Sequence, residues 1–457
     1  MRLGLGLGLF KAGLISAGVR IFSAFQTRVI NDGGTVESGT CVVNGINSSA
    51  LLEQASFLLI PSGYKGGKLY AEIPTNGNGD LTWTRGSTAI RTNSSGLLES
   101  MGTGVPRLSY MYGSCPSALL EPQRTNSIRN STMVGASTSP STLPTNYGVS
   151  GITGTVVGIG TENGLSYVDI RFSGTASGTN TQVQLETTTA ITASNGQTWT
   201  QSVYLKLINT STPPTDYNMR LREGTATGVF VADGITAISP TTSLQRFTYT
   251  RTNTGALTER IQPILLFNQV AGNTYDYTIR IAQPQMELGA YVATPIFTSG
   301  ATATRVTDSF SRSNIYTNGL ISASGGTWFV EFRNNIVYSR DNASSAIFIN
   351  TGTSPSLNDG FRIRNGGTQR FNIDKIVAGV SSSLYSTTTD TVKLAIKWNG
   401  TTADIFANGT KVVSATAFTT TAMEYLNGTP QVPTFIQQMA LFPTPLSDTQ
   451  LTQLTTL

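Results

Sequence analysis

Residues 198–207 read TWTQSVYLKL, and apolar or aromatic side chains alternate with polar ones along them. Alternation with a period of two predicts a β-strand with one buried face. Trp199 shares its face with Val203 and Leu205, so Trp199 is predicted to lie in the core. Tyr204 lies on the opposite face among hydrophilic neighbours, and its ring is predicted to be exposed. The stretch therefore predicts one strand of a β-sandwich, with Tyr204 on its outer face.

The same pattern recurs on both sides of this strand, between residues 125 and 300. Short alternating or apolar runs are spaced by Gly, Asn, Ser and Pro, as two-sheet sandwiches require. The runs are GTVVGIG, LSYVDIRFSG, TQVQLETTTAI, YNMRLREG, QRFTYTRT, RIQPILLFNQV and YDYTIRIAQPQMEL. Residues 285–289, QMELG, predict the last strand of this sandwich. Residues 290–308 predict the connector to the next domain.

A further set of strand-like runs predicts another β-domain over residues 301–457. The runs are TWFVEFRN, SAIFINTG, GFRIRNGG, RFNIDKIV, TVKLAIKWNG, ADIFANGTKVVS and FIQQMALF. Asn-Gly pairs at Asn399, Asn408 and Asn427 predict hairpin turns, because these residues are favoured where both turn positions need positive φ. The final PLSDTQLTQL predicts a short helix with Ser447 as its N-cap.

Residues 26–124 form a module with mixed signals of short strands and turns. NGNGD before Leu81 and NSSG before Leu97 predict turns, and the stretch between them alternates as a strand. Four arginines stand near three carboxylates in this module: Arg85, Arg91, Arg107 and Arg124, with Asp80, Glu99 and Glu121. Internal ion pairs that orient the loops are the preferred interpretation of this set, ahead of a binding site.

Several peptides of this module resemble known proteins. IPSGYKGGKLYAEIP, DLTWTRGSTAIRTNSSGLLES, PRLSY and CPSALLEPQRTN resemble the amino-terminal block of tailed-bacteriophage structural proteins of the fibre, spike and head-appendage class. This resemblance covers residues 26–124 and implies a virion protein. Residues 125–300 resemble the jelly roll of carbohydrate-binding modules. This resemblance implies a sugar-binding domain, and the exposed ring of Tyr204 is then the candidate for stacking against a sugar ring. Residues 301–457 are similar to the concanavalin-A-like and laminin-G-like jelly roll, and such a likeness implies a fold without giving a function.

Residues 1–25 combine a leucine-glycine repeat with a weakly amphipathic stretch. Leucines at alternate positions lie on one side of an extended segment, while glycines leave the other side bare. Glycine loses much chain entropy on ordering, so this segment is predicted to order only against a partner, by strand addition or insertion into a groove. The alternative is a terminal strand packed on the chain's own domain. The predicted docking residues are Leu3, Leu5, Leu7, Leu9, Phe10, Leu14 and Ile15.

Charged residues interrupt the apolar runs at this terminus. Arg2, Lys11 and Arg20 separate runs of eight residues each, whereas a membrane span needs about 20. Lys11 also breaks the apolar run that a signal peptide would need. Neither a membrane span nor a cleaved leader is therefore predicted here.

The composition excludes several classes of chemistry. Only 12% of the residues are charged, against about 25% in ordinary soluble chains, and the net charge is +5. The lysines and arginines form no basic stripe with interleaved aromatic residues, so nucleic-acid binding is not predicted. The chain has no histidine, which excludes Ser-His-Asp and Cys-His triads and the usual zinc sites. The two cysteines, Cys41 and Cys115, are interpreted as small buried apolar residues rather than as a disulfide.

Carboxylates remain the only candidates for catalysis. Glycoside hydrolysis needs two of them about 5 to 9.5 Å apart. Glycanases of the lectin-like fold place these carboxylates on one strand in the pattern Glu-x-Asp-x-x-Glu, and this chain has no such run. Glu331 has no acidic neighbour in the sequence. The other carboxylates of this region are interpreted as solvated acids of turns and strand ends: Asp341, Asp359, Asp374, Asp390, Asp404 and Glu424. No catalytic residue, cofactor or metal ligand is therefore predicted, and no ligand spacing supports a calcium ion.

Together these observations predict a mainly β protein of four parts. Residues 1–25 would dock onto a virion, residues 26–124 would form the phage-type module, and residues 125–300 and 301–457 would form two consecutive sandwiches. The predicted function is a non-enzymatic fibre or decoration protein at the particle surface, in a homo-oligomer such as a trimer, with virion proteins and host glycans as partners. A glycan depolymerase and a purely structural brace are the alternatives.

Overall fold

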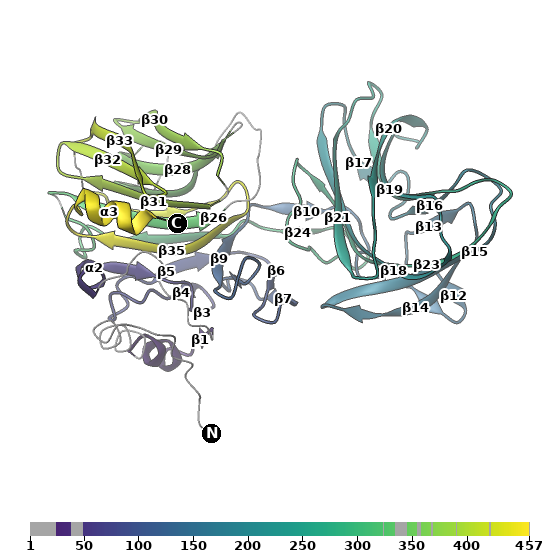
Figure 1. The fold of residues 1–457 in the computed structure, drawn as a ribbon, viewed down its shortest axis with the longest axis horizontal. Helices are drawn as coiled ribbons and strands as arrows, with labels where there is room; N and C mark the ends of the chain where they lie inside the picture. Colours follow the sequence, from purple (N-terminus) through teal and green to yellow (C-terminus); the bar gives the residue numbers. More distant parts are fainter. Residues whose placement is uncertain are drawn as a thin grey trace. The chain divides into compact units, whose positions relative to one another are not determined.

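The computed structural model describes residues 24–37, 49–322, 324–333, 345–353, 358–366, 369–389, 391–419 and 422–456. The predicted docking residues between Leu3 and Ile15 lie outside this part of the chain. The described residues form a mainly β structure with antiparallel sheets, which confirms the predicted fold class. They fall into two compact units (Figure 1). Unit 2 comprises residues 97–99 and 123–305, and unit 1 comprises the remainder.

Unit 1 is a two-sheet sandwich. The strands of its ten-stranded sheet are, in spatial order, β1 (Thr35–Val36), β3 (Gly63–Lys65), β4 (Lys68–Leu69), β5 (Leu81–Thr84), β25 (Ser309–Ser313), β34 (Tyr425–Gly428), β27 (Ser345–Asn350), β28 (Gly360–Gly366), β29 (Gln369–Val377) and β30 (Val380–Thr387). The strands of its eight-stranded sheet are β33 (Thr410–Ala417), β32 (Thr402–Ala407), β31 (Thr391–Trp398), β26 (Gly326–Arg333), β35 (Thr434–Phe442), β9 (Ser117–Leu120) and β8 (Leu108–Ser109), with β2 (Phe57–Leu59) also on β35. Trp83, Trp328 and Trp398 lie in the core between the sheets.

Both sheets of unit 1 combine strands from the two ends of the sequence. β5 pairs with β25, and β2 and β9 pair with β35. The prediction of separate domains over residues 26–124 and 301–457 is therefore wrong, because strands of the first segment complete the sheets of the second. Local alternation predicts a strand but carries no information about its distant partner.

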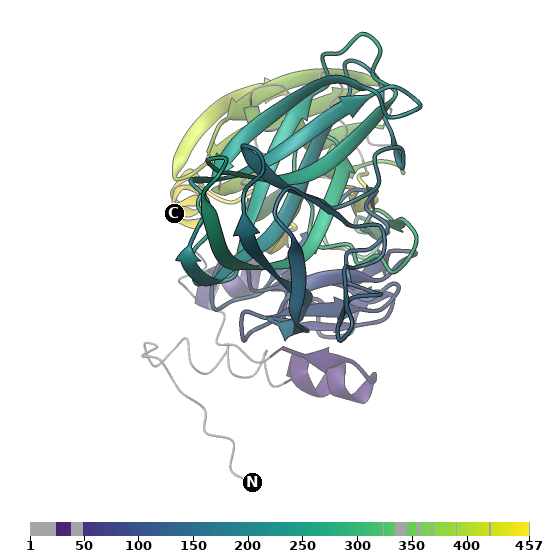
Figure 2. The same cartoon turned by 90° about the vertical axis from the view of Figure 1, so that its right-hand side faces the viewer.

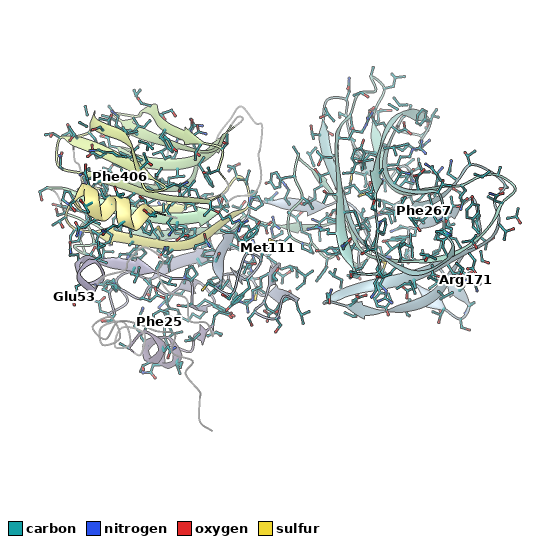
Figure 3. The ribbon with its side chains drawn as sticks, viewed as in Figure 1. Phe25, Glu53, Met111, Arg171, Phe267 and Phe406 are labelled. Carbon is teal, nitrogen blue, oxygen red and sulfur yellow. The ribbon has the colours of Figure 1, made fainter. Side chains whose placement is uncertain are left out.

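Short helices cover apolar surface of unit 1. Helix α3 (Asp448–Thr455) begins at the predicted N-cap Ser447, which forms a capping box with Gln450, and it buries Leu451 and Leu454. These leucines pack with Phe406, which Figure 3 labels, on the outer face of the eight-stranded sheet. Helix α2 (Ser49–Gln54) contributes Leu51 to the same cluster.

Helical residues 24–31 begin the described part of the chain. Phe25 and Val29 are fully buried and pack against Tyr70. The close approach needs a glycine at Gly63, because a Cβ there would lie 2.7 Å from the Phe25 ring. Phe25, the last residue of the predicted docking segment, is therefore buried on its own chain (Figure 3).

Unit 2 is a second sandwich. Its five-stranded sheet has the order β14 (Gly154–Glu162), β15 (Leu165–Thr175), β23 (Thr274–Leu288), β18 (Thr198–Thr212) and β21 (Gln245–Thr252). Its six-stranded sheet has the order β13 (Gly148–Ser150), β16 (Asn180–Gln184), β22 (Arg260–Asn268), β19 (Asp216–Gly224) and β20 (Phe230–Ile238), with β17 (Ile191–Thr192) also on β22. Figure 2 shows these strands in teal. Phe267 lies in the core between the sheets, and Trp199 is buried there as predicted (Figure 3).

Three two-stranded pairs complete the described strands. They are β6 (Ala89–Thr92) with β7 (Leu98–Met101), β10 (Arg124–Asn126) with β24 (Ala303–Arg305), and β11 (Ser137–Thr138) with β12 (Ser141–Thr142). β23 contains the QMEL sequence and is the last strand of the sandwich in unit 2, as predicted. None of the helices among the described residues has the length and apolar character that a membrane crossing requires.

A buried ion-pair cluster forms where unit 2 interrupts the sequence of unit 1. This Asp308 cluster consists of Arg85, Arg107, Glu121 and Asp308, whose side chains are almost completely excluded from solvent. Asp308 accepts from Arg85 at 2.9 Å and also pairs with Arg107. The backbone N–H of Glu121 donates to Asp308, 187 residues away, at 3.0 Å. The cluster therefore joins the segments of unit 1 that precede and follow the insertion.

The turn and cysteine predictions have mixed outcomes. Asn408 and Gly409 have φ values of 47° and 81°, so the hairpin between β32 and β33 turns as predicted. Asn427 lies inside β34, which contradicts the predicted turn, and Gly428 allows close approach of the Phe310 ring. Cys115 is exposed and disulfide-bonded, so its interpretation as a buried apolar thiol is wrong. Cys41 lies outside the described residues.

Candidate functional site

The outer face of the five-stranded sheet in unit 2 brings the predicted Tyr204 into a row of side chains. Ala282 on β23 lies directly between Tyr167 on β15 and Tyr204 on β18. Gly160 on β14 pairs with Tyr167, and Arg246 on β21 pairs with Tyr204. The row Gly160, Tyr167, Ala282, Tyr204 and Arg246 therefore crosses all five strands. We call it the tyrosine row.

The spacing of the tyrosine row suits two neighbouring sugar rings. Adjacent strands lie about 4.8 Å apart, so the two tyrosines start about 10 Å apart. Ala282 is buried between them and adds little side-chain bulk. Tyr167 and Tyr204 are both half-buried. An aromatic ring fixed at its base and open at its rim is the usual platform for the apolar face of a sugar.

Tyr167 is fixed on two sides. The Arg280 guanidinium carbon lies 3.4 Å from the ring centroid. On the neighbouring strand, a Cβ at Gly160 would lie 2.8 Å from the Tyr167 hydroxyl. Gly160 therefore leaves the space into which the tyrosine leans, and Arg280 covers part of the ring by a cation–π contact.

Arg246 on β21 contacts Tyr204 from the side that faces away from Ala282. The guanidinium carbon of Arg246 lies 5.5 Å from the ring centroid. Arg246 donates to the carbonyl of Ala293 at 2.8 Å and to the hydroxyl of Ser202 at 3.0 Å. These bonds fix the arginine, which in turn limits the positions open to the Tyr204 ring.

A second row of charged side chains lies beside the tyrosine row. Asp169, Arg280 and Lys206 stand opposite one another on β15, β23 and β18. Arg280 donates to both oxygens of Asp169, at 2.8 and 2.9 Å. Glu162 accepts from Lys206 at 2.8 Å and also pairs with Arg280. We call Glu162, Asp169, Arg280 and Lys206 the charged row.

The charged row is electrically balanced. It contains two carboxylates and two cations in mutual contact. Hydrogen bonds from Lys206 and Arg280 hold the pKa of Glu162 below its usual value, despite partial burial. The Glu162 carboxylate therefore stays ionised near neutral pH. A general acid would have to be protonated at that pH. Such a row can exchange hydrogen bonds with sugar hydroxyls, but it favours binding over proton transfer.

The connector after β23 closes one end of this face. The backbone N–H of Ile296 donates to Gln285 at 2.7 Å, and that of Ala293 donates to Glu287 at 3.0 Å. Both side chains are fully buried, and burial raises the pKa of Glu287. The residues predicted to form only a connector are thus partly a cover for the sheet, whereas Tyr167 and Tyr204 remain partly exposed.

Three of the four arginines of the arginine-rich module form internal ion pairs, as predicted, although Asp308 and Glu37 were not among the predicted carboxylates and Asp80 pairs with Arg28. Arg85 and Arg107 belong to the Asp308 cluster, and Arg91 pairs with Glu37. Arg124 instead lies over the ring of Tyr291, with its guanidinium carbon 4.2 Å from the centroid. These arginines are structural, as the sequence suggested.

The carboxylates of unit 1 depart from the prediction at two positions, Asp374 and Asp404. Asp374 was predicted to be solvated, but it is fully buried within β29. One of its oxygens accepts from Arg362 at 2.6 Å and from Arg364 at 2.5 Å. Asp404 is paired with Lys411 at 2.9 Å and also lies in a strand. Asp341 and Asp390 lie outside the described residues.

Glu331 is nine-tenths buried on β26 and forms a hydrogen bond with Gln438. Burial raises the pKa of its carboxyl group, and Lys393 opposes the shift. No group of three or more acidic or sulfur ligands that could hold a metal ion occurs among the described residues.

Sequence reasoning found Tyr204 and missed its partners. The alternation in LSYVDIRFSG already places Tyr167 and Asp169 on the face opposite Val168 and Ile170, and this signal was available. The position of Ala282 between the two tyrosines depends on strand register, which no local pattern gives.

Comparisons with solved structures found matches of low similarity only. No family model matches the chain, and no curated protein matches it. A Ruminococcus gnavus IT-sialidase CBM40, bound to α2,3-sialyllactose, is 16% identical over 29% of this chain and 83% of its own, with a TM-score of 0.24.

Two other solved structures are similarly remote. A carbohydrate esterase of the Shiga toxin-encoding bacteriophage phi24B is 14% identical over 32% of this chain and 83% of its own, with a TM-score of 0.24. A CBM22 tandem domain of Paenibacillus barcinonensis Xyn10C is 9% identical over 69% of this chain and 97% of its own, with a TM-score of 0.23.

Proposed function

We propose that this chain is a non-enzymatic virion protein of a tailed bacteriophage that binds host-surface glycans. The glycan site is the outer face of the five-stranded sheet of unit 2. The observation that carries this site is the tyrosine row, in which Ala282 separates two half-buried tyrosines. The phage part of the proposal rests on the sequence resemblance of residues 26–124.

The chemistry of the face favours a neutral saccharide. The charged row has no net charge, so it offers donors and acceptors to hydroxyl groups without attracting ions. Stacking on one tyrosine contributes about 1 kcal/mol, which gives weak affinity for a single copy. Several copies on one particle would raise the avidity, which fits a homo-oligomeric attachment protein.

Replacing Tyr204 by Ala is expected to weaken retention by a neutral polysaccharide about fivefold, because one stacking surface that contributes about 1 kcal/mol is lost. Affinity electrophoresis of the whole chain in gels that contain dextran, xylan or galactomannan measures this. Tyr204→Phe keeps the ring and is the matched control, so it should retain most of the binding. Equal retention of Tyr204→Ala and wild-type protein in every gel that retards the wild type would refute the site.

The same preparations test the enzymatic alternative. Incubation with these polysaccharides should release no reducing ends, because the accessible Glu162 is held ionised by Lys206 and Arg280. Release that is lost in Glu162→Gln would instead show that this face is a hydrolase site.

Removing residues 1–23 should abolish incorporation into particles while unit 1 remains folded. The helical residues that begin at 24 hold Phe25 and Val29 in place, so the cut spares every described contact. Incorporation is measured by sedimentation with purified particles, and thermal unfolding of the truncated chain is the control. Unchanged incorporation would contradict the anchoring role of Leu3 to Ile15.

A further inference from the structure

The outer face of the six-stranded sheet in unit 2 carries an excess of arginines. Arg222 on β19 stands opposite Gln262 on β22, and Gly224 stands opposite Arg260. Arg222 and Arg260 are therefore diagonal neighbours on one face, with side chains starting about 7 Å apart. Arg220 lies on the same face two residues before Arg222. Three cations thus gather over two adjacent strands.

One carboxylate among the described residues pairs with this group. Asp233 on β20 binds Arg220 at 2.6 Å. Arg222 donates to the carbonyl of Gly228 at 3.0 Å and forms no ion pair with a described residue. Arg260 donates to the carbonyl of Glu259 at 2.8 Å, while the Glu259 carboxylate accepts from the backbone of Ala226. Asp233 stands directly opposite Arg222 on β20 and offsets part of its charge without a direct ion pair. The Arg222 and Arg260 guanidinium groups therefore donate to backbone carbonyls and form no ion pair with a described carboxylate.

The environment of Arg222 makes an anion favourable there. Burial lowers the pKa of this guanidinium, and the like charge of Arg220 lowers it further. Asp233 opposes these two effects without reversing them, and a bound carboxylate would add to its stabilisation of the positive charge. The two-pronged guanidinium matches the geometry of a carboxylate, which gives charge-assisted hydrogen bonds.

An aromatic ring and one unused amide group accompany these cations. Phe230 is 51% exposed, and its ring centroid lies 5.8 Å from the Arg222 guanidinium carbon. Its neighbour Val229 is 63% exposed. Asn218 lies on the same face two residues before Arg220, and its buried Nδ2 has no hydrogen-bond partner. Exposed aromatic surface beside an amide and cations matches the apolar face, hydroxyls and acid group of a charged sugar.

We propose that this face binds a carboxylate-bearing polysaccharide, with an acid group on Arg222 and Arg260 and a sugar ring against Phe230. The proposal is independent of the neutral-glycan site, because the two sites use opposite sheets and different charges. The charged row of the five-stranded sheet is balanced, whereas the described residues of this face include three arginines and two carboxylates, Asp233 and Asp216. The geometry favours a polysaccharide over a nucleic acid. Nucleic-acid binding needs several cations along the phosphates and several aromatic rings for the bases, whereas this face offers Phe230 and the two arginines without an ion pair to a described carboxylate, Arg222 and Arg260.

The test compares two forms of one polymer with the whole chain. Biolayer interferometry with polygalacturonate should detect binding that weakens with salt, and the methyl-esterified polymer, which has the same backbone but blocked acids, should bind at least tenfold more weakly. Arg222→Gln should lower the affinity for polygalacturonate at least tenfold. Arg171→Gln is the control, because Arg171 lies on the opposite sheet, is 47% exposed, and its replacement changes the net charge equally. This variant should bind as wild type does.

Several results would overturn the proposal. Equal binding of the esterified polymer would show that the acid group is not recognised. An equal loss in Arg222→Gln and Arg171→Gln would reduce the effect to net charge, and wild-type affinity of Arg222→Gln would remove the site. Stronger binding of single-stranded DNA than of polygalacturonate would assign the face to another class of ligand. Tyr204→Ala should leave polygalacturonate binding unchanged. The proposal for this face and the proposal for the tyrosine row can therefore be refuted independently.

Discussion

Replacing Asp308 by Asn is expected to lower the free energy of unfolding of unit 1 by about 3–5 kcal/mol. The change leaves Arg85 and Arg107 fully buried without the carboxylate that they share. Burial alone would lower the pKa of Arg107, but Asp308 and Glu121 outweigh it and raise that pKa. Removing one of two buried acids from a set of two buried cations therefore leaves a net positive charge in the interior.

The measurement is urea unfolding followed by tryptophan fluorescence in a Trp199→Phe background. Of the four tryptophans, Trp83, Trp328 and Trp398 are buried in unit 1, so this background reports on unit 1 alone. Asp448→Asn is the control in the same unit, because Asp448 is 53% exposed and pairs with Lys411 at 3.1 Å. Its cost should stay below about 1 kcal/mol. Similar losses in the two variants would show that the cluster is not a stability determinant.

The Asp308 cluster also shows why the domain organisation was missed from sequence. Each strand of unit 1 is recognisable from its own alternation, because a period of two is a local property. Thr84 and Ser309 share a hydrogen bond although 225 residues separate them. The pairing of β5 with β25 depends on such distant partners, and the Asp308–Glu121 backbone bonds fix it. No local pattern predicts that the ten-stranded sheet of unit 1 continues from β5 to β25 across the residues of unit 2.

The candidate sites show the same limit. The sequence places Tyr204 on the polar face of its strand, and the structure leaves it half-buried there. Arg222 and Arg260 are 38 positions apart in the sequence, and only the register of β19 with β22 makes them neighbours. Asp374 was misjudged for the same reason, since Arg362 and Arg364 reach it from the adjacent strand. The alternation within a strand predicts the face on which a side chain lies. It does not predict which residues of the adjacent strands lie beside that side chain.

Glu72 gives the second large effect, a dependence of stability on pH. Its carboxyl group is fully buried, and burial raises its pKa to about 8, against the hydrogen bonds from Ile60 and Ser62. The geometry fits the protonated form. The Ser62 hydroxyl lies 2.9 Å from the Ile60 carbonyl and 2.7 Å from Glu72 Oε1. A hydroxyl has one proton, so Ser62 can donate to Ile60 while a protonated Glu72 donates to Ser62.

Glu72→Gln should therefore remove a loss of stability that the wild-type protein shows between about pH 5 and pH 8. A carboxyl whose pKa is raised on folding binds its proton more tightly in the folded state. Stability from this group is fully present below the unfolded pKa of 4.5 and is lost as the pH rises toward 8, by about 1.4 kcal/mol per pH unit. Gln is a neutral isostere whose amide can accept from Ile60 and donate to Ser62.

Unfolding of unit 1 at pH 5, 6.5 and 8 in the Trp199→Phe background measures this slope. We expect the wild-type and Glu72→Gln chains to differ little at pH 5, and the variant to be more stable at pH 8 by on the order of 3 kcal/mol. Glu53→Gln, at an exposed residue of α2 (Figure 3), controls for the loss of one acid and should follow the wild-type slope. The chain has no histidine, so the residue type that ordinarily titrates in this range is absent. Parallel slopes for Glu72→Gln and wild type would show that Glu72 is ionised in the folded protein, because a neutral replacement could then change the stability only by a constant amount.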